Sequence, residues 1–462
     1  MNSIILLTIF GVLNLFVGFR KSNKLVLPLV FLFLAIVFGV NLYDWNNTQT
    51  YFRQFDHMLT MDNFAVAFTA VVVLTTILVI PFAQRYAVEQ HDSLAEFFSI
   101  LLFALVGAIM MVAYENLLML FVGIEILSIS MYVLAGSDKK NLKSNEAGLK
   151  YFLMGSFATG ILLFGIVLIY GATGTFQITE ISSVATSQGD ALTSPLLAMG
   201  LLFTLIGISF KVSAAPFHFW TPDVYEGAPT LFTAFMSTVV KTAGFAGFYK
   251  LMSVSFAGAY DIWFPTLVAM TVITLAIGNI GAAAQQSFKR MMAYSSISHA
   301  GYLMIALLAF NDRSENAILF YSLAYSVATI AAFGILKLVS DHRGDISYNA
   351  FNGLGRTNPL LAAVMTISMC SLAGIPLTGG FFGKLFIFSA ALEQNLLWLI
   401  VVAILMSMVG IYYYFRVVIA MYMKEPAGEL VPVNGSAAFV LLVMAVLTVV
   451  LGIFPGMLSN VL

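Results

Sequence analysis

Apolar residues along this chain fall into long blocks that short polar segments separate. A helix that crosses a lipid bilayer needs about 20 mostly apolar residues, and fourteen blocks come close to that length. The pattern predicts an all-α polytopic membrane protein with about 14 transmembrane helices. The predicted spans are residues 3–19, 25–42, 63–83, 94–113, 117–135, 148–171, 194–212, 230–252, 262–283, 291–310, 315–339, 358–391, 395–423 and 434–457.

Two of the predicted spans contain residues that interrupt a helix. Span seven runs into Lys211-Val-Ser-Ala-Ala-Pro216, and span twelve contains Gly374-Ile-Pro-Leu-Thr-Gly-Gly380. Proline lacks a backbone donor and clashes with the preceding turn, so both helices should break there. At membrane depth a break survives only where protein or a water-filled cavity satisfies the freed backbone groups. Transporters use such broken helices as ion sites.

The order of the spans suggests an internal repeat. Spans four to eight and nine to thirteen form two sets of five, and the broken, lysine-bearing helix is fourth in each set. An odd number of spans per set makes the two sets run in opposite directions across the membrane. We therefore expect two inverted five-helix repeats. The expected units are three N-terminal helices (1–92), a first repeat (93–252), a second, inverted repeat (262–423) and a C-terminal helix (434–462).

Basic residues concentrate in alternate loops. One set of loops holds Arg20, Lys21, Lys24, Arg85, Lys139, Lys140, Lys143, Lys289, Arg290, Arg343, Arg356 and Lys424. The other set holds little more than Arg53, Lys250 and Arg313. Loops rich in lysine and arginine stay in the cytoplasm. Both termini, and the polar stretches Asn41–Asp62 and Thr173–Asp190, are then expected outside.

Composition narrows the class further. The chain is 60% hydrophobic and 9% charged, whereas a soluble domain carries about 25% charge. Its 21 lysines and arginines balance 22 acidic residues, which leaves no basic face for nucleic acid. Cys370 is the only cysteine, and the five histidines show no metal-binding spacing, so we expect no disulfide, iron–sulfur cluster or zinc site here. Nucleotide-binding glycine motifs are also lacking.

Four charges lie deep inside apolar spans: Glu125, Lys211, Lys241 and Lys384. A charged side chain at the bilayer centre costs about 2.5–3.5 kcal/mol on insertion scales. Such charges either pack against a neighbouring helix, snorkel to the surface or carry function. Buried lysine and glutamate can hold and release protons, because a neighbouring charge shifts the balance between their two forms. We read these four as proton-transfer groups, with Glu125 and Lys211 as a pair that opens and closes.

Other polar residues in or near spans are weaker candidates. His299 lies mid-span in Ser295-Ser-Ile-Ser-His299 and suits a proton relay, although it could simply hydrogen-bond to its neighbours. Lys337 lies near a span end beside Asp341, where snorkelling is favoured. Glu96, near the start of span four, is expected to be an interfacial or packing residue. Solvated or capping roles are expected for Asp223 and Glu226 in the loop after the span-seven break.

These segments resemble a known family. Lys211-Val-Ser-Ala-Ala-Pro-Phe-His-Phe-Trp-Thr-Pro-Asp-Val-Tyr-Glu-Gly-Ala-Pro-Thr230, together with mid-span Glu125, Val-Val-Lys241-Thr-Ala-Gly and Gly-Ile-Pro-Leu-Thr-Gly-Gly-Phe-Phe-Gly-Lys384, is similar to the proton-conducting membrane subunits of respiratory complex I and their Mrp-type antiporter relatives. The resemblance covers nearly the whole chain. It implies that Glu125 and Lys211 form a coupling pair, that Lys241 is central to the proton axis and that Lys384 lies on the exit side. His299 falls where the family often has a relay histidine.

The resemblance also implies a place in a complex. The chain ends soon after span fourteen, unlike the similar L-type subunits, and has Lys384 where M-type subunits have glutamate. Implied partners are those M and L types, small membrane subunits and the lipids of a bacterial inner membrane. FMN and iron–sulfur clusters would reside on other subunits of the NADH-quinone oxidoreductase translocase, and none on this chain. A cation/proton antiporter, a membrane-bound hydrogenase subunit and a purely structural membrane subunit remain alternatives.

Overall fold

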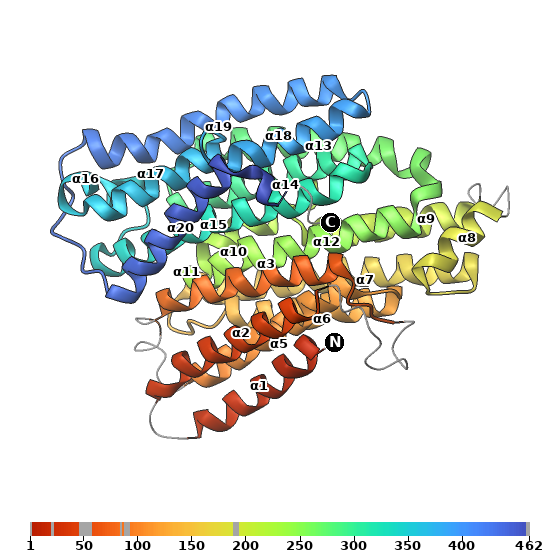
Figure 1. Cartoon of the computed structure of the whole chain (residues 1–462), viewed down its shortest axis with the longest axis horizontal. Helices are drawn as coiled ribbons and strands as arrows, with labels where there is room; N and C mark the ends of the chain where they lie inside the picture. The colour runs from red at the N-terminus through yellow and green to blue at the C-terminus, as the bar shows by residue number, and fades with distance from the viewer. Residues whose placement is uncertain are drawn as a thin grey trace.

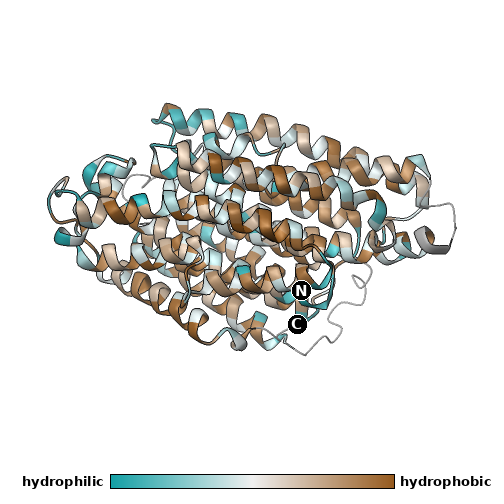
Figure 2. Ribbon diagram, turned by 90° about the horizontal axis from the view of Figure 1, so that it is seen from above, coloured by the Kyte–Doolittle hydropathy of each residue, from teal (hydrophilic) through white to brown (hydrophobic). Residues whose placement is uncertain are grey.

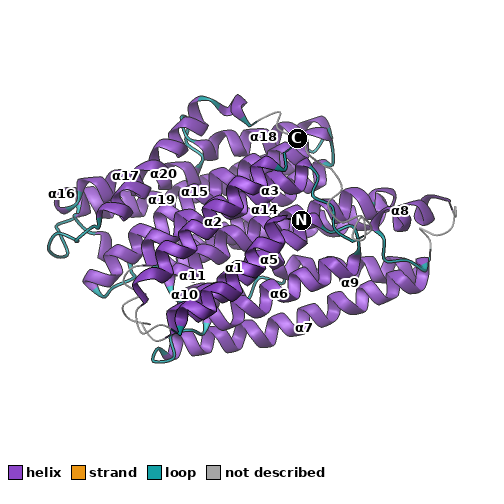
Figure 3. Cartoon of the chain, turned by 60° about the horizontal axis from the view of Figure 1, so that its bottom comes forward, coloured by secondary structure: helices purple, strands orange, loops and turns teal. Residues whose placement is uncertain are grey.

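The computed structural model describes residues 2–19, 23–45, 58–83, 86, 93–187 and 194–458. Within these ranges the regular structure is helical, and extended pairing is limited to isolated bridges such as Asn116 with Gln177. Figures 1 and 3 show long helices lying side by side along a common direction. The predicted all-α class is confirmed for the described part of the chain.

The N-terminal part contains α1 (Asn2–Gly18), α2 (Val26–Tyr43), α3 (Asn63–Val79) with η3 (Ile80–Ala83), α5 (Leu94–Ala113), α6 (Leu117–Ala135), α7 (Leu142–Thr173) and α8 (Ile178–Ser187). The middle contains α9 (Pro195–Lys211), α10 (Trp220–Gly227), α11 (Thr230–Phe235), η6 (Met236–Val240), α12 (Lys241–Lys250), η7 (Leu251–Ser255), η8 (Ala257–Ala259) and α13 (Tyr260–Ala284). The remainder contains α14 (Phe288–Ala309), α15 (Asp312–Arg343), α16 (Leu354–Thr357), α17 (Pro359–Ala373), α18 (Gly379–Glu393), α19 (Leu397–Met423) and α20 (Gly435–Ile453).

Length and composition mark the chain as a multi-pass membrane protein. Eleven helical segments among the described residues are long and apolar enough to cross a membrane, and three apolar helices, α1, α9 and α17, are shorter. Figure 2 shows apolar residues along most helices, while hydrophilic residues gather toward their ends and the loops. The apolar blocks of the sequence therefore form the helical bundle.

Both predicted helix breaks are present. α9 ends at Lys211, and α10 begins only at Trp220. α17 ends at Ala373, where Gly374 adopts a φ of 85° that favours glycine, and α18 begins at Gly379. The short α9 and α17 are thus the first halves of interrupted elements, as the prolines and glycines of these segments predicted.

Several residues that were expected in loops lie in helices instead, among them Lys143 in α7, Arg343 in α15 and Arg356 in α16. Asp223 and Glu226 were expected in a loop, but they lie in the short helix α10. Pro222 does not prevent this helix, because a proline in the first turn would have had no backbone partner to lose. Lys289 and Arg290 were also expected in a loop, but they belong to the first turn of α14, which begins at Phe288.

Inner and outer helices differ sharply in burial. The most apolar windows of α15 and of the segment Thr230–Ser255 are 100% buried, and that of α14 is 94% buried. The corresponding windows of α7, α19 and α20 are each 33% buried. The outer helices therefore present apolar side chains to their surroundings, and the central three elements are screened from lipid.

Several basic residues of the predicted cytoplasmic loops gather at one end of the bundle, among them Lys143, Lys289 and Arg290. In Figures 1 and 3, α10, α11 and α16 lie at one end and α8 lies at the other. An ion pair between Arg356 of α16 and Glu425 brings the segment after α19 to the first end, which we call the basic end.

Some residues of the predicted loops lie outside the described part of the chain. These are Arg20, Lys21, Arg53 and Arg85, together with residues 46–57 and 188–190 of the two long polar stretches.

Candidate functional site

The first predicted pair is close but not in direct contact. Lys211 ends α9 and is buried, and its amino group donates a hydrogen bond of 2.8 Å to the hydroxyl of Ser128 on α6. Glu125 lies three residues before Ser128, on the same face of that helix. It is near enough for its charge to act on Lys211, without a hydrogen bond or ion pair between the two. Ser128 thus occupies the position that a closed pair would give to the carboxylate.

Lys241 lies in the most enclosed part of the bundle. It is 3% exposed, and its amino group donates to both the backbone carbonyl and the hydroxyl of Ser296 on α14. The ring of Tyr325 on α15 lies 5.8 Å from the same nitrogen. The π-helical turn η6 immediately precedes Lys241, and such turns are frequent at functional sites. The amine is therefore held by a carbonyl and a hydroxyl of α14 and faces an aromatic ring of α15.

His299 is hydrogen-bonded through both ring nitrogens. Its Nδ1 lies 2.6 Å from the hydroxyl of Tyr321 on α15, and its Nε2 lies 3.0 Å from the hydroxyl of Tyr414 on α19. The Tyr414 hydroxyl also contacts the hydroxyl of Ser295. A buried imidazole between two hydroxyls can accept a proton on one side and donate one on the other.

Lys384 lies in the second helix break. Its amino group donates to the carbonyl of Ala373, the last residue of α17, at 3.0 Å and to the Ser407 hydroxyl at 2.8 Å. The Tyr302 ring lies 4.7 Å from this nitrogen. A cation at a helix C-terminus satisfies free carbonyls there, so Lys384 also stabilises the break itself.

Three of the five predicted site residues lie close together. The His299 ring lies 4.7 Å from the ring of Tyr325, which Lys241 faces, and 5.9 Å from the ring of Tyr302, which Lys384 faces. We call Lys241, His299 and Lys384 the buried row. Lys211 and Glu125 form a separate group on α9 and α6, and no direct hydrogen bond joins it to the buried row among the described residues. The pair and the buried row are linked through helix packing, in which α9 contacts α12 and α6 contacts α11.

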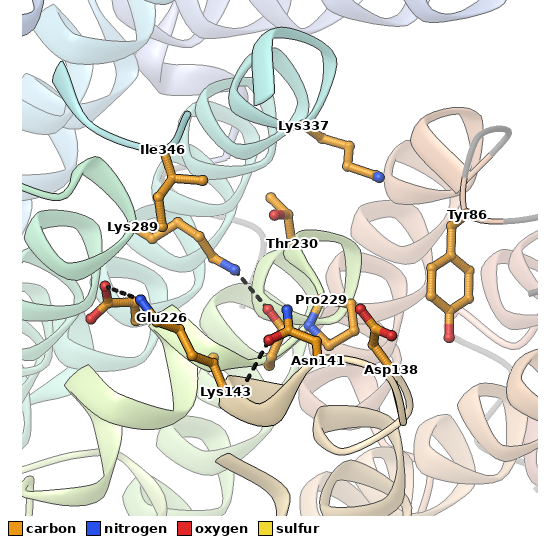
Figure 4. A pocket seen from close by; sticks show the side chains of 12 residues that line it. Tyr86, Asp138, Asn141, Lys143, Glu226, Pro229, Thr230, Lys289, Lys337 and Ile346 are labelled. Carbon is orange, nitrogen blue, oxygen red and sulfur yellow. Dashed lines mark hydrogen bonds and ion pairs between the residues drawn. The ribbon is translucent and has the colours of Figure 1, made fainter. Parts of the chain in front are cut away.

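Sequence reasoning missed a second polar cluster, at the basic end. Lys289 is 4% exposed, and its amino group donates to the Ala228 carbonyl at 2.6 Å. It lines a cavity of about 210 Å³ together with Lys143, Glu226 and Lys337. In Figure 4, Lys289, Lys143 and Glu226 lie on one side of this cavity, and Lys337 and Tyr86 lie on the other. The polar residues next to Lys289 are typical of a loop, and for this reason the sequence predicted that Lys289 lies in a loop.

An ion-pair network joins three helices at the same end of the bundle. Asp223 on α10 accepts from Lys150 on α7 at 2.7 Å and from Arg290 on α14 at 2.8 Å, and Glu226 accepts from Arg290 at 3.0 Å. Burial alone would raise the pKa of Asp223, but its bonds to Lys150 and Arg290 hold that pKa below its usual value. The network is thus intact near neutral pH and ties α10 to α7 and α14.

Lys337, for which snorkelling was expected, forms an ion pair with Asp341 at 2.6 Å. At the opposite end, Lys250 forms a further pair with Glu115 at 2.7 Å. No group of three histidine, cysteine, aspartate or glutamate residues suited to a metal ion occurs within the described ranges.

Close packing at the second break yields a stability prediction. A Cβ atom at Gly380 would lie 1.9 Å from the backbone oxygen of Ser371. Gly380→Ala should therefore push α18 away from α17 and lower the free energy of unfolding by about 1–3 kcal/mol. The measurement is thermal unfolding of the purified complex. Gly160→Ala is the matched control, because nothing lies within 4 Å of that position, and a Gly380→Ala complex as stable as this control would contradict the prediction.

Comparison with known proteins points to one family. The family model described as "NADH:quinone oxidoreductase/Mrp antiporter, TM" matches residues 114–410. The chain is 39% identical over its full length to a protein of Cytophaga hutchinsonii named NADH-quinone oxidoreductase subunit N, covering 99% of that protein. It is 40% identical to the protein of the same name from Flavobacterium psychrophilum, with 100% of both chains covered.

Solved structures agree with this fold. A chain of respiratory complex I from Thermus thermophilus is 31% identical, with a TM-score of 0.85 over 99% of this chain and 98% of that one. A chain of an archaeal membrane-bound sulfane sulfur reductase is 27% identical, with a TM-score of 0.89 over 100% and 96%. A chain of the Mrp complex from Dietzia is 20% identical with a TM-score of 0.85, covering 100% and 96%, and supports the fold alone.

Proposed function

Because the chain belongs to the membrane-spanning NADH:quinone oxidoreductase/Mrp antiporter family, we propose that it is the N-type, proton-translocating membrane subunit of an NADH-quinone oxidoreductase. The observation that carries this proposal is the buried row, in which the rings of Tyr325 and Tyr302 beside His299 each face a buried lysine. Groups that can each gain and lose a proton, held in sequence inside a membrane bundle, are the parts of a proton path. Full-length identity of 39–40% to proteins named subunit N supports the subunit type.

Within this function we assign a role to each predicted residue. Lys241 and Lys384 hold the transferred proton, and His299 passes it between them through its hydroxyl partners. Glu125 and Lys211 act as a switch, in which the amine exchanges the Ser128 hydroxyl for the carboxylate. The short distance from Lys211 to Ser128 supports this assignment, because Ser128 is one helical turn from Glu125.

We also propose 14 spans in two inverted repeats, α5 to η7 and α13 to α19. The two broken elements support this arrangement, since each pairs a short apolar helix with a second helix. The units are then 1–92, 93–252, 262–423 and 434–462, as the sequence suggested.

The chain works with partners in this proposal. Other antiporter-like subunits and small membrane subunits contact it in the plane of a bacterial inner membrane. NADH oxidation and quinone reduction take place on other subunits, which carry FMN and iron–sulfur clusters. The structural relatives support such an assembly, because they come from multisubunit membrane complexes.

A second candidate is a subunit of an antiporter or another respiratory membrane complex. The TM-score of 0.89 to the sulfane sulfur reductase chain supports this second candidate, although the two chains are only 27% identical. Affinity purification of the tagged chain in mild detergent distinguishes the proposed function from this second candidate. Copurification of a flavin-containing NADH dehydrogenase activity is expected, and a complex that lacks this activity would refute the proposed function.

Topology gives a further prediction. The positive-inside rule places the basic end in the cytoplasm and both termini outside. Reporter fusions after Lys140 and at the C-terminus should therefore report opposite sides of the membrane. Two cytoplasmic reports would contradict the proposed number of spans.

A further inference from the structure

Four buried side chains from three helices form a continuous series of hydrogen bonds. The Tyr414 hydroxyl of α19 contacts the hydroxyl of Ser295 and lies 3.0 Å from Nε2 of His299, both on α14. On the other side of the ring, the Tyr321 hydroxyl of α15 lies 2.6 Å from Nδ1. We call Ser295, Tyr414, His299 and Tyr321 the histidine network. Each member is at most 3% exposed, so the members are partnered by one another and not by bulk solvent.

The histidine network has two complementary arrangements. A neutral imidazole carries a hydrogen on only one ring nitrogen, whereas a hydroxyl can donate or accept. If Nδ1 of His299 carries the hydrogen, it donates to Tyr321, while Nε2 accepts from Tyr414. The Tyr414 oxygen then accepts from Ser295. If Nε2 carries the hydrogen, all donors and acceptors exchange roles, and the same three hydrogen bonds form.

A histidine that relays protons has to visit both neutral tautomers. A proton that arrives at one ring nitrogen and leaves from the other converts one tautomer into the other. A tautomer that left a buried hydroxyl or N–H without a partner would be populated about tenfold less or lower still, because unpaired buried polar groups are costly. The relay would then wait in the favoured tautomer. The two arrangements of the histidine network avoid this imbalance.

Ser295 takes part in this balance without touching the imidazole. When Nε2 of His299 carries the hydrogen, the Tyr414 oxygen is occupied as an acceptor, and its own hydrogen needs another acceptor. The Ser295 oxygen is that acceptor. Ser295 therefore acts on His299 only through the hydroxyl of Tyr414.

Neighbouring bonds hold Tyr414 in place. The Tyr413 hydroxyl donates to the side chain of Asn279 on α13 at 3.3 Å. Arg416 donates to the carbonyl of Ala283, also on α13, at 3.2 Å. These bonds lie on either side of Tyr414 along α19 and fix the helix against α13. The Tyr414 oxygen thus keeps its position while its hydrogen turns between the two partners.

We propose that Tyr414 and Ser295 are positioning residues for His299, which exchange donor and acceptor roles so that both neutral tautomers of the imidazole stay fully paired. This inference rests on the proposed function, because only a histidine that passes protons needs both tautomers. No proton leaves the pair in this exchange. The hydroxyl hydrogen of Tyr414 turns from Nε2 to the Ser295 oxygen, and the hydrogen of Ser295 turns away from Tyr414.

Ser295→Ala tests the pair without removing any partner of the imidazole. NADH-driven proton uptake by membrane vesicles should fall about tenfold, because the Tyr414 hydroxyl then has no acceptor in one of the two tautomers. Ser295→Thr keeps a hydroxyl and should pump far better than Ser295→Ala. Ser368→Ala is the matched control, since the Ser368 hydroxyl is also buried but donates to its own helix at Val364.

A double variant shows whether Ser295 acts through Tyr414. Tyr414→Phe removes the partner of Nε2 and should lower uptake about tenfold or more. Adding Ser295→Ala should cause no further loss, because residues that act through one shared contact are not additive. Tyr151→Phe is the control, since Tyr151 is equally buried and its hydroxyl has no hydrogen bond among the described residues. Losses that multiplied in the double variant would contradict the proposed pair.

The ratio of uptake rates in light and heavy water separates proton handling from packing. In Ser295→Ala the exchange between tautomers becomes the slow step, so this ratio should rise above that of the unmodified complex. A packing defect would lower the amount or stability of the complex and leave the ratio unchanged. Slower uptake with an unchanged ratio would therefore refute the positioning role.

The outcomes distinguish this inference from the proposed function. Normal uptake in assembled Ser295→Ala and Tyr414→Phe complexes would overturn the positioning role. If Lys241→Arg also pumped normally, the proposed function would fail with it. If Lys241→Arg stopped uptake while the other two variants pumped normally, only the role of Tyr414 and Ser295 would be wrong.

Discussion

Lys241→Arg should yield an assembled complex in which proton uptake per NADH falls to the low level of Lys241→Ala. Arginine keeps the positive charge and can still donate to the carbonyl and hydroxyl of Ser296. It cannot release a proton in a protein, whereas lysine can. A proton-transfer group contributes about 100-fold or more to a rate, so loss of transfer outweighs retention of charge.

The structure offers a matched control nine residues away. Lys250 is also buried at the other end of α12, and it is neutralised by an ion pair with Glu115 at 2.7 Å. Arginine can form the same pair, so Lys250→Arg should assemble and pump normally. The measurement is NADH-driven proton uptake in vesicles, normalised to the amount of intact complex. If intact Lys241→Arg pumps at the normal rate, Lys241 holds helices together and does not release protons.

The residues of the buried row lie deep inside apolar runs of the sequence, and this position was enough to predict that they are buried. A charge that costs about 2.5–3.5 kcal/mol at the membrane centre needs a compensating environment. Lys241, His299 and Lys384 each have one, made of carbonyls, hydroxyls and aromatic rings. Their burial therefore followed from local sequence alone, and so did the two breaks beside Lys211 and Lys384.

The partners of these residues could not be predicted in the same way. Ser296 lies 55 positions from Lys241, and Tyr414 lies 115 positions from His299. The spacing along a span tells which residues share a face, but it carries no information on which helix that face meets.

The errors at the basic end have a common cause. Asp223 and Glu226 stand among prolines, glycines and charges, and Lys289 follows the polar run Gln285-Gln286-Ser287; both patterns are typical of loops. Ion pairs among α7, α10 and α14 compensate these charges and allow short helical turns to pack there. The stabilising contacts come from three separate segments, so local composition predicted solvent exposure and was wrong.

Glu125→Ala should abolish most proton uptake while the complex still assembles. Glu125 is half-buried on α6, and its charge acts on Lys211. Without the carboxylate, the amine keeps its hydrogen bond to Ser128 and has no anion to which it can move. The pair then cannot open and close. Uptake should fall by about tenfold or more, as for loss of a proton-transfer group, whereas Lys211 remains held in place.

Two further variants decide whether the charge or the shape of Glu125 matters. Glu125→Asp keeps a shorter carboxylate and should retain part of the uptake, whereas Glu125→Gln keeps the shape without the charge and should resemble Glu125→Ala. Glu96→Ala is the matched control, because it removes an exposed carboxylate from the first turn of α5 and should pump normally. Uptake is measured in vesicles with equal amounts of assembled complex. Normal uptake in Glu125→Gln would show that Lys211 works without an acidic partner, and the proposed switch would then have to lie elsewhere on α9.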